Sequence, residues 1–114
     1  MMPKRVVIVT GSRSLDDSAL VGRCLAELKP DLVVEGGARG ADAIAREWAL
    51  THDVTPVTVH ALWLGRGRAA GHYRNALMLE LFPGATVLAF PRGGPGTADC
   101  IRQARALGMR VVER

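Results

Sequence analysis

Residues 33–42, VVEGGARGAD, place a run of apolar residues directly before two glycines and an arginine. A short continuous apolar run is typical of a buried strand, and the residues from Ala41 onward predict a helix. A strand that ends at Gly36 and Gly37 and gives way to a helix near Ala41 leaves backbone N–H groups exposed at the helix start, where an anion can bind. This stretch therefore predicts a strand–loop–helix unit with a place for an anion.

The same alternation of strand and helix continues along the chain. Asp16 or Asp17 can cap the first helix, and Pro30 ends it. We expect strands near residues 6–9, 32–34, 57–59, 85–90 and 110–112, and helices near 20–28, 41–49, 73–81 and 97–107. Strict alternation predicts an α/β fold in which a mostly parallel sheet lies between helices on both faces. A chain of 114 residues fits a single domain, residues 1–114.

In a parallel sheet, every strand-to-helix loop emerges at the edge where the carboxyl ends of the strands lie. Ten of the thirteen glycines fall in these predicted loops: Gly11, Gly36, Gly37, Gly40, Gly65, Gly67, Gly71, Gly93, Gly94 and Gly96. Six arginines belong to the same loops or to the turn that follows: Arg13, Arg39, Arg66, Arg68, Arg74 and Arg92. The sequence thus predicts one edge of the sheet that is rich in glycine, so that a ligand can approach the backbone, and that is positively charged through its arginines.

Three loops of this edge carry the candidate ligand-binding residues. GGARG is the strongest candidate, because glycines before a helix start favour phosphate binding. For Asp42, which follows it, a role in the ligand site and simple support of the helix dipole are equally good interpretations. GGPGT is a second glycine-rich loop before a helix start, and we expect Thr97 to cap that helix. The candidates are Gly11, Ser12, Arg13, Gly36, Gly37, Ala38, Arg39, Gly40, Asp42, Gly93, Gly94, Gly96 and Thr97.

Arg74 and Asn75 are further candidates, expected at the start of the third helix. An arginine is poorly placed there for the helix dipole, so it favours a ligand or a carboxylate partner. Neither glycine loop is followed by the Gly-Lys-Ser/Thr of a P-loop, and the first loop, GSRSLDD, lacks the G-x-G-x-x-G of dinucleotide folds. These absences argue against ATP hydrolysis and NAD binding.

Composition and charge limit the class of protein and the kind of partner. Hydrophobic residues make up 48% and charged residues 23%, as in ordinary globular proteins. The net charge of +4 favours anionic partners, and thirteen of the fifteen basic residues are arginine, whose planar fork suits phosphate. The apolar run at 6–9 is too short for a signal peptide, and no run approaches the roughly 18 residues of a membrane span. We therefore expect a cytoplasmic protein without a membrane partner.

The two cysteines, Cys24 and Cys100, fall on apolar faces of predicted helices, so we expect buried, reduced thiols. The three histidines show no metal-ligand spacing with either cysteine. We therefore expect no metal site, and we expect no cofactor.

The motifs GSR, GGARGAD, RN-x-x-M (Arg74, Asn75 and Met78) and GGPGTAD, in this order, resemble the SLOG superfamily of Rossmann-like nucleotide-binding domains, and within it the YspA and cpYpsA-related branch. The resemblance extends from about Val6 to Val112. It implies a three-layer Rossmann-like fold with strand order 3-2-1-4-5 and a nucleotide-type ligand at the glycine-rich edge. It also implies a homodimer or higher oligomer.

Two groups of relatives imply different activities. In LOG-type phosphoribohydrolases, which release a base from a nucleoside monophosphate, the motifs R-x-x-x-M and PGGxGTxxE are similar to Arg74 with Met78 and to GGPGTAD, so Arg74 and Asp99 stand where catalytic residues stand. Asp99 is one methylene shorter than glutamate, and support of the helix dipole is its alternative role. DprA, which binds single-stranded DNA, carries similar GSR, GGA-x-G-x-D and RN elements.

These inferences rank three functions. The first is binding of a phosphate-containing small ligand, a nucleotide or an ADP-ribose-like derivative. The second is phosphoribohydrolase activity through Arg74 and Asp99, and the third is binding of single-stranded DNA. Whether the chain is an enzyme stays open at this point.

Overall fold

The computed structural model describes residues 5–62 and 67–114. Gly65 and Arg66, which belong to the predicted glycine- and arginine-rich loops, lie outside the described residues, and the side chain of Arg68 is not described. In the described ranges the elements are β1 (Val6–Gly11), α1 (Ser18–Leu28), β2 (Leu32–Glu35), α2 (Ala41–Thr51), β3 (Thr55–Thr58), the 3₁₀ turn η1 (Gly67–Ala69), α4 (Ala70–Leu81), β4 (Thr86–Phe90), α5 (Pro95–Ala106) and β5 (Val111–Glu113).

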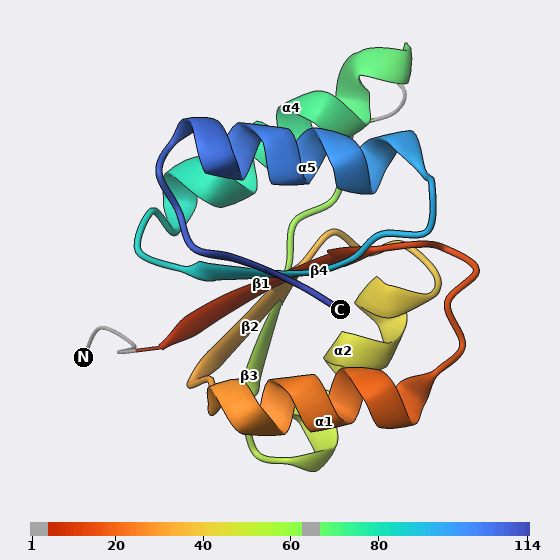
Figure 1. The fold of residues 1–114 in the computed structure, drawn as a ribbon, viewed down its shortest axis with the longest axis vertical. Coiled ribbons are helices and arrows are strands. Elements are labelled where there is room, and N and C mark those ends of the chain that lie inside the picture. The colour runs from red at the N-terminus through yellow and green to blue at the C-terminus, as the bar shows by residue number, and fades with distance from the viewer. Residues whose placement is uncertain (1–4, 63–66) are drawn as a thin grey trace.

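The five strands form one parallel sheet in the order β3-β2-β1-β4-β5. Helices α1 and α2 cover one face of this sheet, and α4 and α5 cover the other (Figure 1). The predicted three-layer Rossmann-like fold and its strand order are therefore confirmed. With β1 in the middle, the order reverses beside it: β2 and β3 lie on one side, β4 and β5 on the other. Ligands of open α/β sheets bind next to such a reversal, at the carboxyl ends of the strands.

Alternate residues of the strands build a core on each face of the sheet. Val7 and Val9 of β1 pack with Leu25 on the side of α1 and α2, whereas Ile8 packs with Met78 and Cys100 on the side of α4 and α5. All of these side chains are buried. Burial on both faces explains why the strands read as continuous apolar runs instead of alternating ones.

The cysteines lie one in each of these cores, Cys24 with α1 and Cys100 with α5, and both thiols are free and buried, as expected. Asp17 is the residue that caps α1, because its Oδ1 accepts the N–H of Leu20 at 3.0 Å. No helix in the described ranges combines the length and the apolar character needed to cross a membrane.

Two predicted helix starts were wrong. Helix α5 begins at Pro95 with Gly94 as its N-cap, so Thr97 is the third helical residue and not the cap. Proline at the first helical position needs no hydrogen-bond partner for its nitrogen, which favours this earlier start. Helix α4 begins at Ala70, directly after η1, so Arg74 lies in its second turn and not at its beginning.

Candidate functional site

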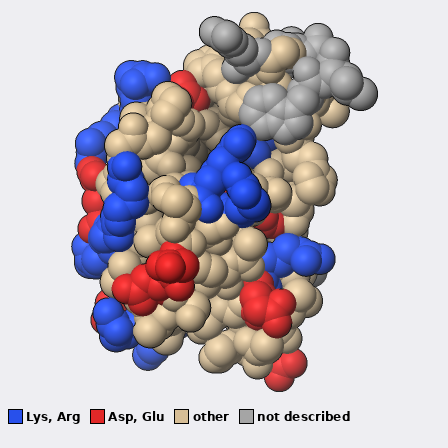
Figure 2. All heavy atoms as spheres, turned by 90° about the vertical axis from the view of Figure 1, so that its right-hand side faces the viewer, with Lys and Arg blue, Asp and Glu red and all other residues tan. Residues whose placement is uncertain are grey.

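A pocket of about 740 Å³ opens at the carboxyl edge of the sheet, and we call it the edge pocket. Figure 2 looks onto this edge and shows basic side chains gathered near its centre. Loops that are far apart in the sequence supply its walls. The lining residues are Thr10, Gly11, Ser12, Arg13, Ser14, Ala38, Asp42, Gly71, His72, Arg74, Gly94, Pro95, Gly96, Thr97, Asp99 and Arg102.

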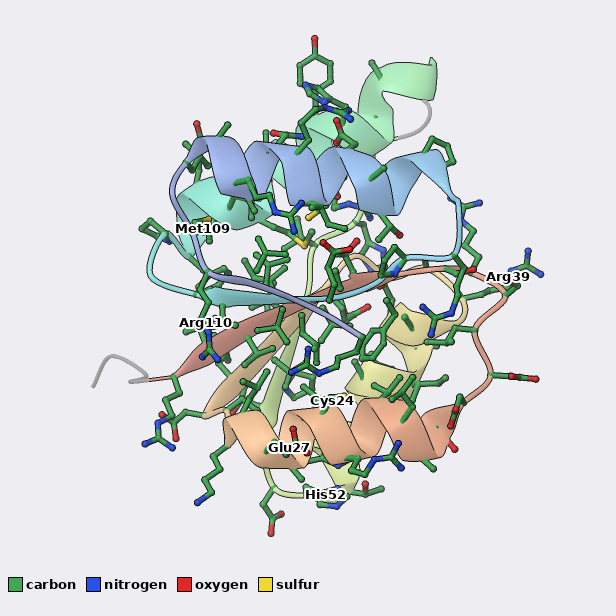
Figure 3. All side chains as sticks on the ribbon, viewed as in Figure 1. Cys24, Glu27, Arg39, His52, Met109 and Arg110 are labelled. Carbon is green, nitrogen blue, oxygen red and sulfur yellow. The ribbon has the colours of Figure 1, made fainter. Side chains whose placement is uncertain are left out.

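A smaller pocket of about 230 Å³, the loop pocket, lies beside it and shares Arg13, Ala38 and Arg74 with it. The loop pocket is further lined by Gly36, Gly37, Arg39, His60 and Ala61. Arg39 is exposed, and its side chain extends away from the body of the protein (Figure 3). The loops that carry GSR, GGARG and GGPGT thus meet at one edge.

Most of the predicted site residues therefore lie together. Ten line the edge pocket: Gly11, Ser12, Arg13, Ala38, Asp42, Arg74, Gly94, Gly96, Thr97 and Asp99. Gly36, Gly37 and Arg39 line only the loop pocket. Gly40, Asn75 and Gly93 line neither of the two.

Three backbone donors of the GGARG loop, those of Gly36, Gly37 and Ala38, already have partners within the chain. Asp42 Oδ2 accepts the N–H groups of Gly36 at 3.0 Å and Ala38 at 3.3 Å, and Glu35 Oε1 accepts the N–H of Gly37 at 2.7 Å. The Asp42 carboxylate thus occupies the position where the sequence predicted a ligand anion. This loop is built around an internal anion.

Asp42 is 5% exposed, and burial raises its pKa to about 6. The nearby Glu35, which is fully buried, acts in the same direction, whereas the backbone hydrogen bonds and the Arg74 guanidinium act against it. At neutral pH the carboxylate is mainly ionised. Its negative charge makes this wall of the edge pocket unfavourable for a second anion.

Glycines 36 and 40 serve the packing of the loop itself. A Cβ at Gly36 would lie 2.3 Å from Arg74 Nη1, and one at Gly40 would lie 2.2 Å from the carbonyl oxygen of Ser12. Arg74 Nη1 donates to the carbonyl oxygen of Gly36 at 2.7 Å, so this arginine fastens α4 to the loop after β2. The backbone contact and the positive φ of Gly40 explain why that position is glycine, whereas at Gly36 the neighbour is the end of the Arg74 side chain.

The start of α5 differs from that loop. A Cβ at Gly94 or Gly96 would meet nothing within 4 Å, and Gly94 has ordinary extended dihedrals, φ −78° and ψ 144°. The start of α5, like that of α2, has no side-chain cap. Because Pro95 has no N–H group, the N–H groups of Gly96 and Thr97 are the first-turn donors that have no hydrogen-bond partner among the described residues. Both residues line the edge pocket, so this end of α5 is free to receive a ligand anion.

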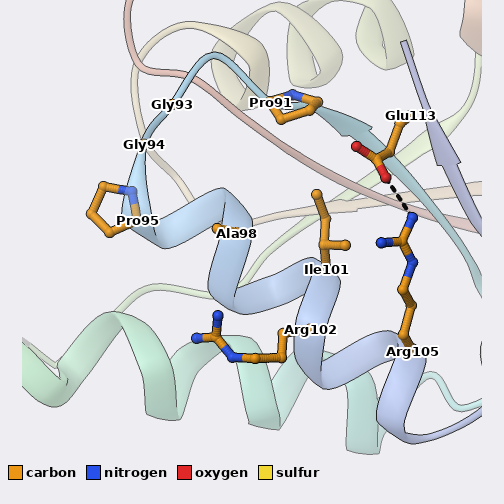
Figure 4. A pocket seen from close by; sticks show the side chains of 9 residues that line it. All are labelled: Pro91, Gly93, Gly94, Pro95, Ala98, Ile101, Arg102, Arg105 and Glu113. Carbon is orange, nitrogen blue, oxygen red and sulfur yellow. Dashed lines mark hydrogen bonds and ion pairs between the residues drawn. The ribbon is translucent and has the colours of Figure 1, made fainter.

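Gly93 lies on the other flank of the same loop. It lines a third pocket of about 590 Å³, between the start of α5 and β5, together with Ile101 and the ion pair of Arg105 with Glu113 (Figure 4). Gly93 has φ +91°, a conformation that favours glycine in any case. The backbone conformation of the turn between β4 and α5 therefore explains why residue 93 is glycine.

Asp99 is held by four donors on the wall of the edge pocket. Its Oδ2 accepts from Asn75 at 3.0 Å and Gln103 at 2.8 Å, and its Oδ1 accepts from His72 at 2.8 Å and Arg102 at 3.2 Å. Burial acts to raise the pKa of Asp99, but the hydrogen bonds from Asn75, His72 and Gln103 outweigh it and hold the pKa below its ordinary value. The group is a fixed carboxylate at neutral pH.

Asn75 connects the two residues that the sequence analysis named as catalytic. It is buried, accepts from Arg74 Nε at 2.9 Å and donates to Asp99 Oδ2, so Arg74, Asn75 and Asp99 form one hydrogen-bonded chain. Asn75 therefore does not line the pocket itself but holds Arg74 and Asp99, which do.

Sequence reasoning missed His72 and Arg102, which both line the edge pocket. Arg102 stands three residues after Asp99, and this helical spacing was a usable signal for their ion pair. His72 is 27 residues from Asp99 in the sequence, so nothing local in the chain announces their contact.

Comparison with known proteins shows which family this chain belongs to. Residues 5–64 match the family described as YspA, cpYpsA-related SLOG. The chain belongs to this SLOG family. It is also 42% identical over 120 aligned residues to the Gene 61 protein of Mycobacterium phage D29, which covers 95% of this chain and 94% of the phage protein.

Two solved structures share the fold of this SLOG protein. DNA processing protein A (DprA) from Streptococcus pneumoniae superimposes with a TM-score of 0.77 at 18% identity, over 96% of this chain and 50% of that one. The protein TM1055 superimposes with a TM-score of 0.64 at 20% identity, over 94% of this chain and 72% of that one. The SLOG chain thus spans half the length of the DprA chain.

The family match covers only part of the edge pocket of the SLOG protein. The matched residues include the GSR and GGARG loops, whereas α4 and α5, with His72, Asp99 and the open helix start, follow later in the chain. The family and the Rossmann-like fold support a nucleotide-related function. The chemistry of the pocket has to be argued from its own residues.

Proposed function

We propose that the edge pocket binds a small ligand through a phosphate group, and that the ligand is a nucleotide or an ADP-ribose-like derivative. The observation that carries this proposal is the start of α5. Gly96 and Thr97 present open backbone N–H groups to the pocket, and neither packing nor backbone conformation requires glycine at Gly94 or Gly96. Open donors at a helix N-terminus, with room in front of them, favour a phosphate.

The charges around the pocket agree with this position of the phosphate. Arg13, Arg74 and Arg102 line the pocket, while the buried carboxyl side chains of Glu35 and Asp42 lie at the loop after β2. We therefore place the phosphate at α5 and not at residues 36–38, whose donors bind Asp42 and Glu35. The volume of about 740 Å³ is within the range of small-molecule sites.

A thermal-shift screen of nucleoside monophosphates, nucleoside diphosphates and ADP-ribose tests the proposal. A ligand at about 100 times its dissociation constant adds roughly 2.7 kcal/mol of stability, which raises the melting temperature by several degrees. The matched controls are the same nucleosides without phosphate, which are expected to give a much smaller shift. Equal shifts with and without phosphate, or no shift with any compound, would contradict the proposal.

Phosphoribohydrolase activity is the second candidate, favoured by the hydrogen-bonded chain from Arg74 through Asn75 to Asp99. With its low pKa, Asp99 is a poor proton acceptor, so its contribution would be a fixed negative charge next to an oxocarbenium-like transition state. Release of free base from nucleoside monophosphates by the wild type and by Asp99→Asn tests this role. Indistinguishable rates remove Asp99 from the reaction.

Binding of single-stranded DNA remains the third proposal. The fold shared with DprA and the net charge of +4 are its support. Such binding weakens steeply with salt in proportion to the phosphates contacted. A titration of a labelled oligonucleotide at several salt concentrations decides it, and affinity that is absent or insensitive to salt counts against it.

A further inference from the structure

His72 and Asp99 form an imidazole–carboxylate pair on the wall of the edge pocket. His72 Nδ1 lies 2.8 Å from Asp99 Oδ1, and both residues line the pocket. The His72 side chain is 55% exposed, whereas that of Asp99 is 13% exposed. The pair therefore has an inner carboxylate and an outer ring that a ligand can reach.

The carboxylate is fixed from behind. Asn75, itself buried, and Gln103 donate to Asp99 Oδ2, and Gln103 Nε2 also donates to the backbone oxygen of His72 at 3.2 Å. Because an ionised carboxylate can only accept, we assign the proton of this contact to His72 Nδ1, which also lies 3.2 Å from Gln103 Nε2. A ring whose Nδ1 is engaged in this way has its tautomer and orientation set by the carboxylate, as in other carboxylate–histidine pairs.

The second ring nitrogen, Nε2, makes no hydrogen bond within the described residues. Tyr73 makes a T-shaped contact with the ring, with 5.7 Å between ring centroids, and His72 lines the pocket. His72 thus combines an orientation fixed by Asp99 with a second ring nitrogen that has no hydrogen-bond partner in the described part of the chain.

The charges that face His72 are of both signs. Asp99 of α5 favours the protonated ring, and Arg102, 3.2 Å from the same Asp99 oxygen, opposes it. Arg13, Arg74 and Asp42 line the same pocket. A bound phosphate would add a negative charge on this side of the ring, which favours its protonated form.

We propose that His72, oriented by Asp99, is the residue that couples ligand binding in this pocket to a proton. A phosphate held at the start of α5 is met by His72 Nε2, and the ring takes up a proton from solvent as the phosphate binds. The resulting imidazolium donates through Nδ1 to Asp99 and through Nε2 to a phosphate oxygen. Affinity then falls as the pH rises. This inference rests on the proposed function of the same pocket.

Isothermal titration calorimetry with a nucleoside monophosphate, AMP, measures this proton directly. Titrations near neutral pH in two buffers of different ionisation enthalpy give the number of protons taken up. We expect a fractional uptake by the wild type. His72→Gln is expected to bind on the order of tenfold more weakly, because a charge-assisted hydrogen bond is lost, and to take up fewer protons than the wild type.

The positioning role of Asp99 is tested without ligand, by NMR titration of the histidine rings. Asp99→Asn removes the facing anion and is expected to move the titration midpoint of His72 to lower pH. Arg102→Gln removes the opposing cation and is expected to move it to higher pH. His52, which stacks on Trp48 at the far end of α2, is the internal control and should not move in either variant.

The outcomes separate the two proposals. If AMP and every other nucleotide fail to bind while the His72 midpoint moves as expected, the proposed function fails and the pair alone is established. If AMP binds without proton uptake and His72→Gln binds equally well, the proposed function stands and the inference about His72 is overturned. Unmoved His72 midpoints in Asp99→Asn and Arg102→Gln overturn the positioning role of Asp99.

Discussion

The carbonyl oxygen of Ser12 lies so close to Gly40 that a Cβ at Gly40 would be 2.2 Å from it. The same oxygen accepts the N–H of Ala41 at 3.2 Å, and Gly40 has φ +72°. The loop after β1 and the start of α2 are therefore in direct backbone contact. This contact, 28 residues apart along the chain, fixes the distance between two walls of the edge pocket.

Gly40→Ala is expected to destabilise the protein by about 2 kcal/mol or more, because the new Cβ meets backbone and because alanine is strained at positive φ. Urea unfolding followed by circular dichroism measures the loss. Gly84→Ala is the matched control: its Cβ meets nothing within 4 Å, so its stability should be unchanged or slightly higher. Equal stabilities of the two variants would contradict the backbone contact.

Asp42 is expected to make stability depend on pH. Its pKa is raised from 3.8 to about 6 in the folded protein, so the folded state binds more protons than the unfolded state between these values. The free energy of unfolding should therefore decrease as the pH rises from about 4 to about 6, at up to about 1.4 kcal/mol per pH unit and up to about 3 kcal/mol in all.

Asp42→Asn removes this dependence while its amide oxygen still accepts from the loop. Urea unfolding of both proteins at pH 4, 5, 6 and 7 isolates the contribution of Asp42 as the difference between the two curves. Asp99 acts at lower pH with the opposite sign, and it is common to both proteins. A difference that does not change with pH would show that the carboxyl group of Asp42 is not perturbed.

Gly96→Ala separates ligand binding from folding. A Cβ at this position meets nothing within 4 Å, and alanine favours helices more than glycine, so stability should be kept or rise by up to about 1 kcal/mol. The same methyl group fills the space where we place the phosphate. Calorimetry should show AMP binding at least about tenfold weaker than in the wild type, with Gly84→Ala unchanged. Wild-type affinity in Gly96→Ala would move the phosphate elsewhere.

Neither thiol is expected to react in the folded protein. Burial raises the pKa of Cys100 to about 11, against a hydrogen bond from Thr10 that lowers it, and Cys24 is 6% exposed. Because the thiolate is the nucleophile, iodoacetamide at pH 8 should label neither residue without denaturant and both in urea, as read by mass spectrometry. Fast labelling of Cys100 under native conditions would mean that the core beneath the pocket opens.

The sequence was enough to predict the fold because local signals agreed with one another. Continuous apolar runs, helical spacing and glycine or proline at the ends of elements all pointed to the same alternation, and parallel connections then leave few arrangements. The sequence located helix starts less accurately: the hydroxyl of Thr97 indicated a cap, whereas Pro95 two residues earlier suits the first helical position.

The site was predictable as a region but not in its contacts. The glycines and arginines of the loops after parallel strands marked the edge correctly. The sequence did not indicate that Asp42 turns back to bind Gly36, six residues earlier, or that His72 meets Asp99 of another helix. Such contacts depend on how loops and helices pack, which no periodicity in a single sequence encodes.

The central claim is that a phosphate binds the open N–H groups at the start of α5. Titration of ¹⁵N-labelled protein with AMP, followed by two-dimensional NMR, tests it most directly. We predict that the largest shifts fall on the amides of Gly96 and Thr97, and that those of Gly36 and Ala38 move little because they stay bound to Asp42. Largest shifts at Gly36 and Ala38, or no shift at the start of α5, would contradict the account.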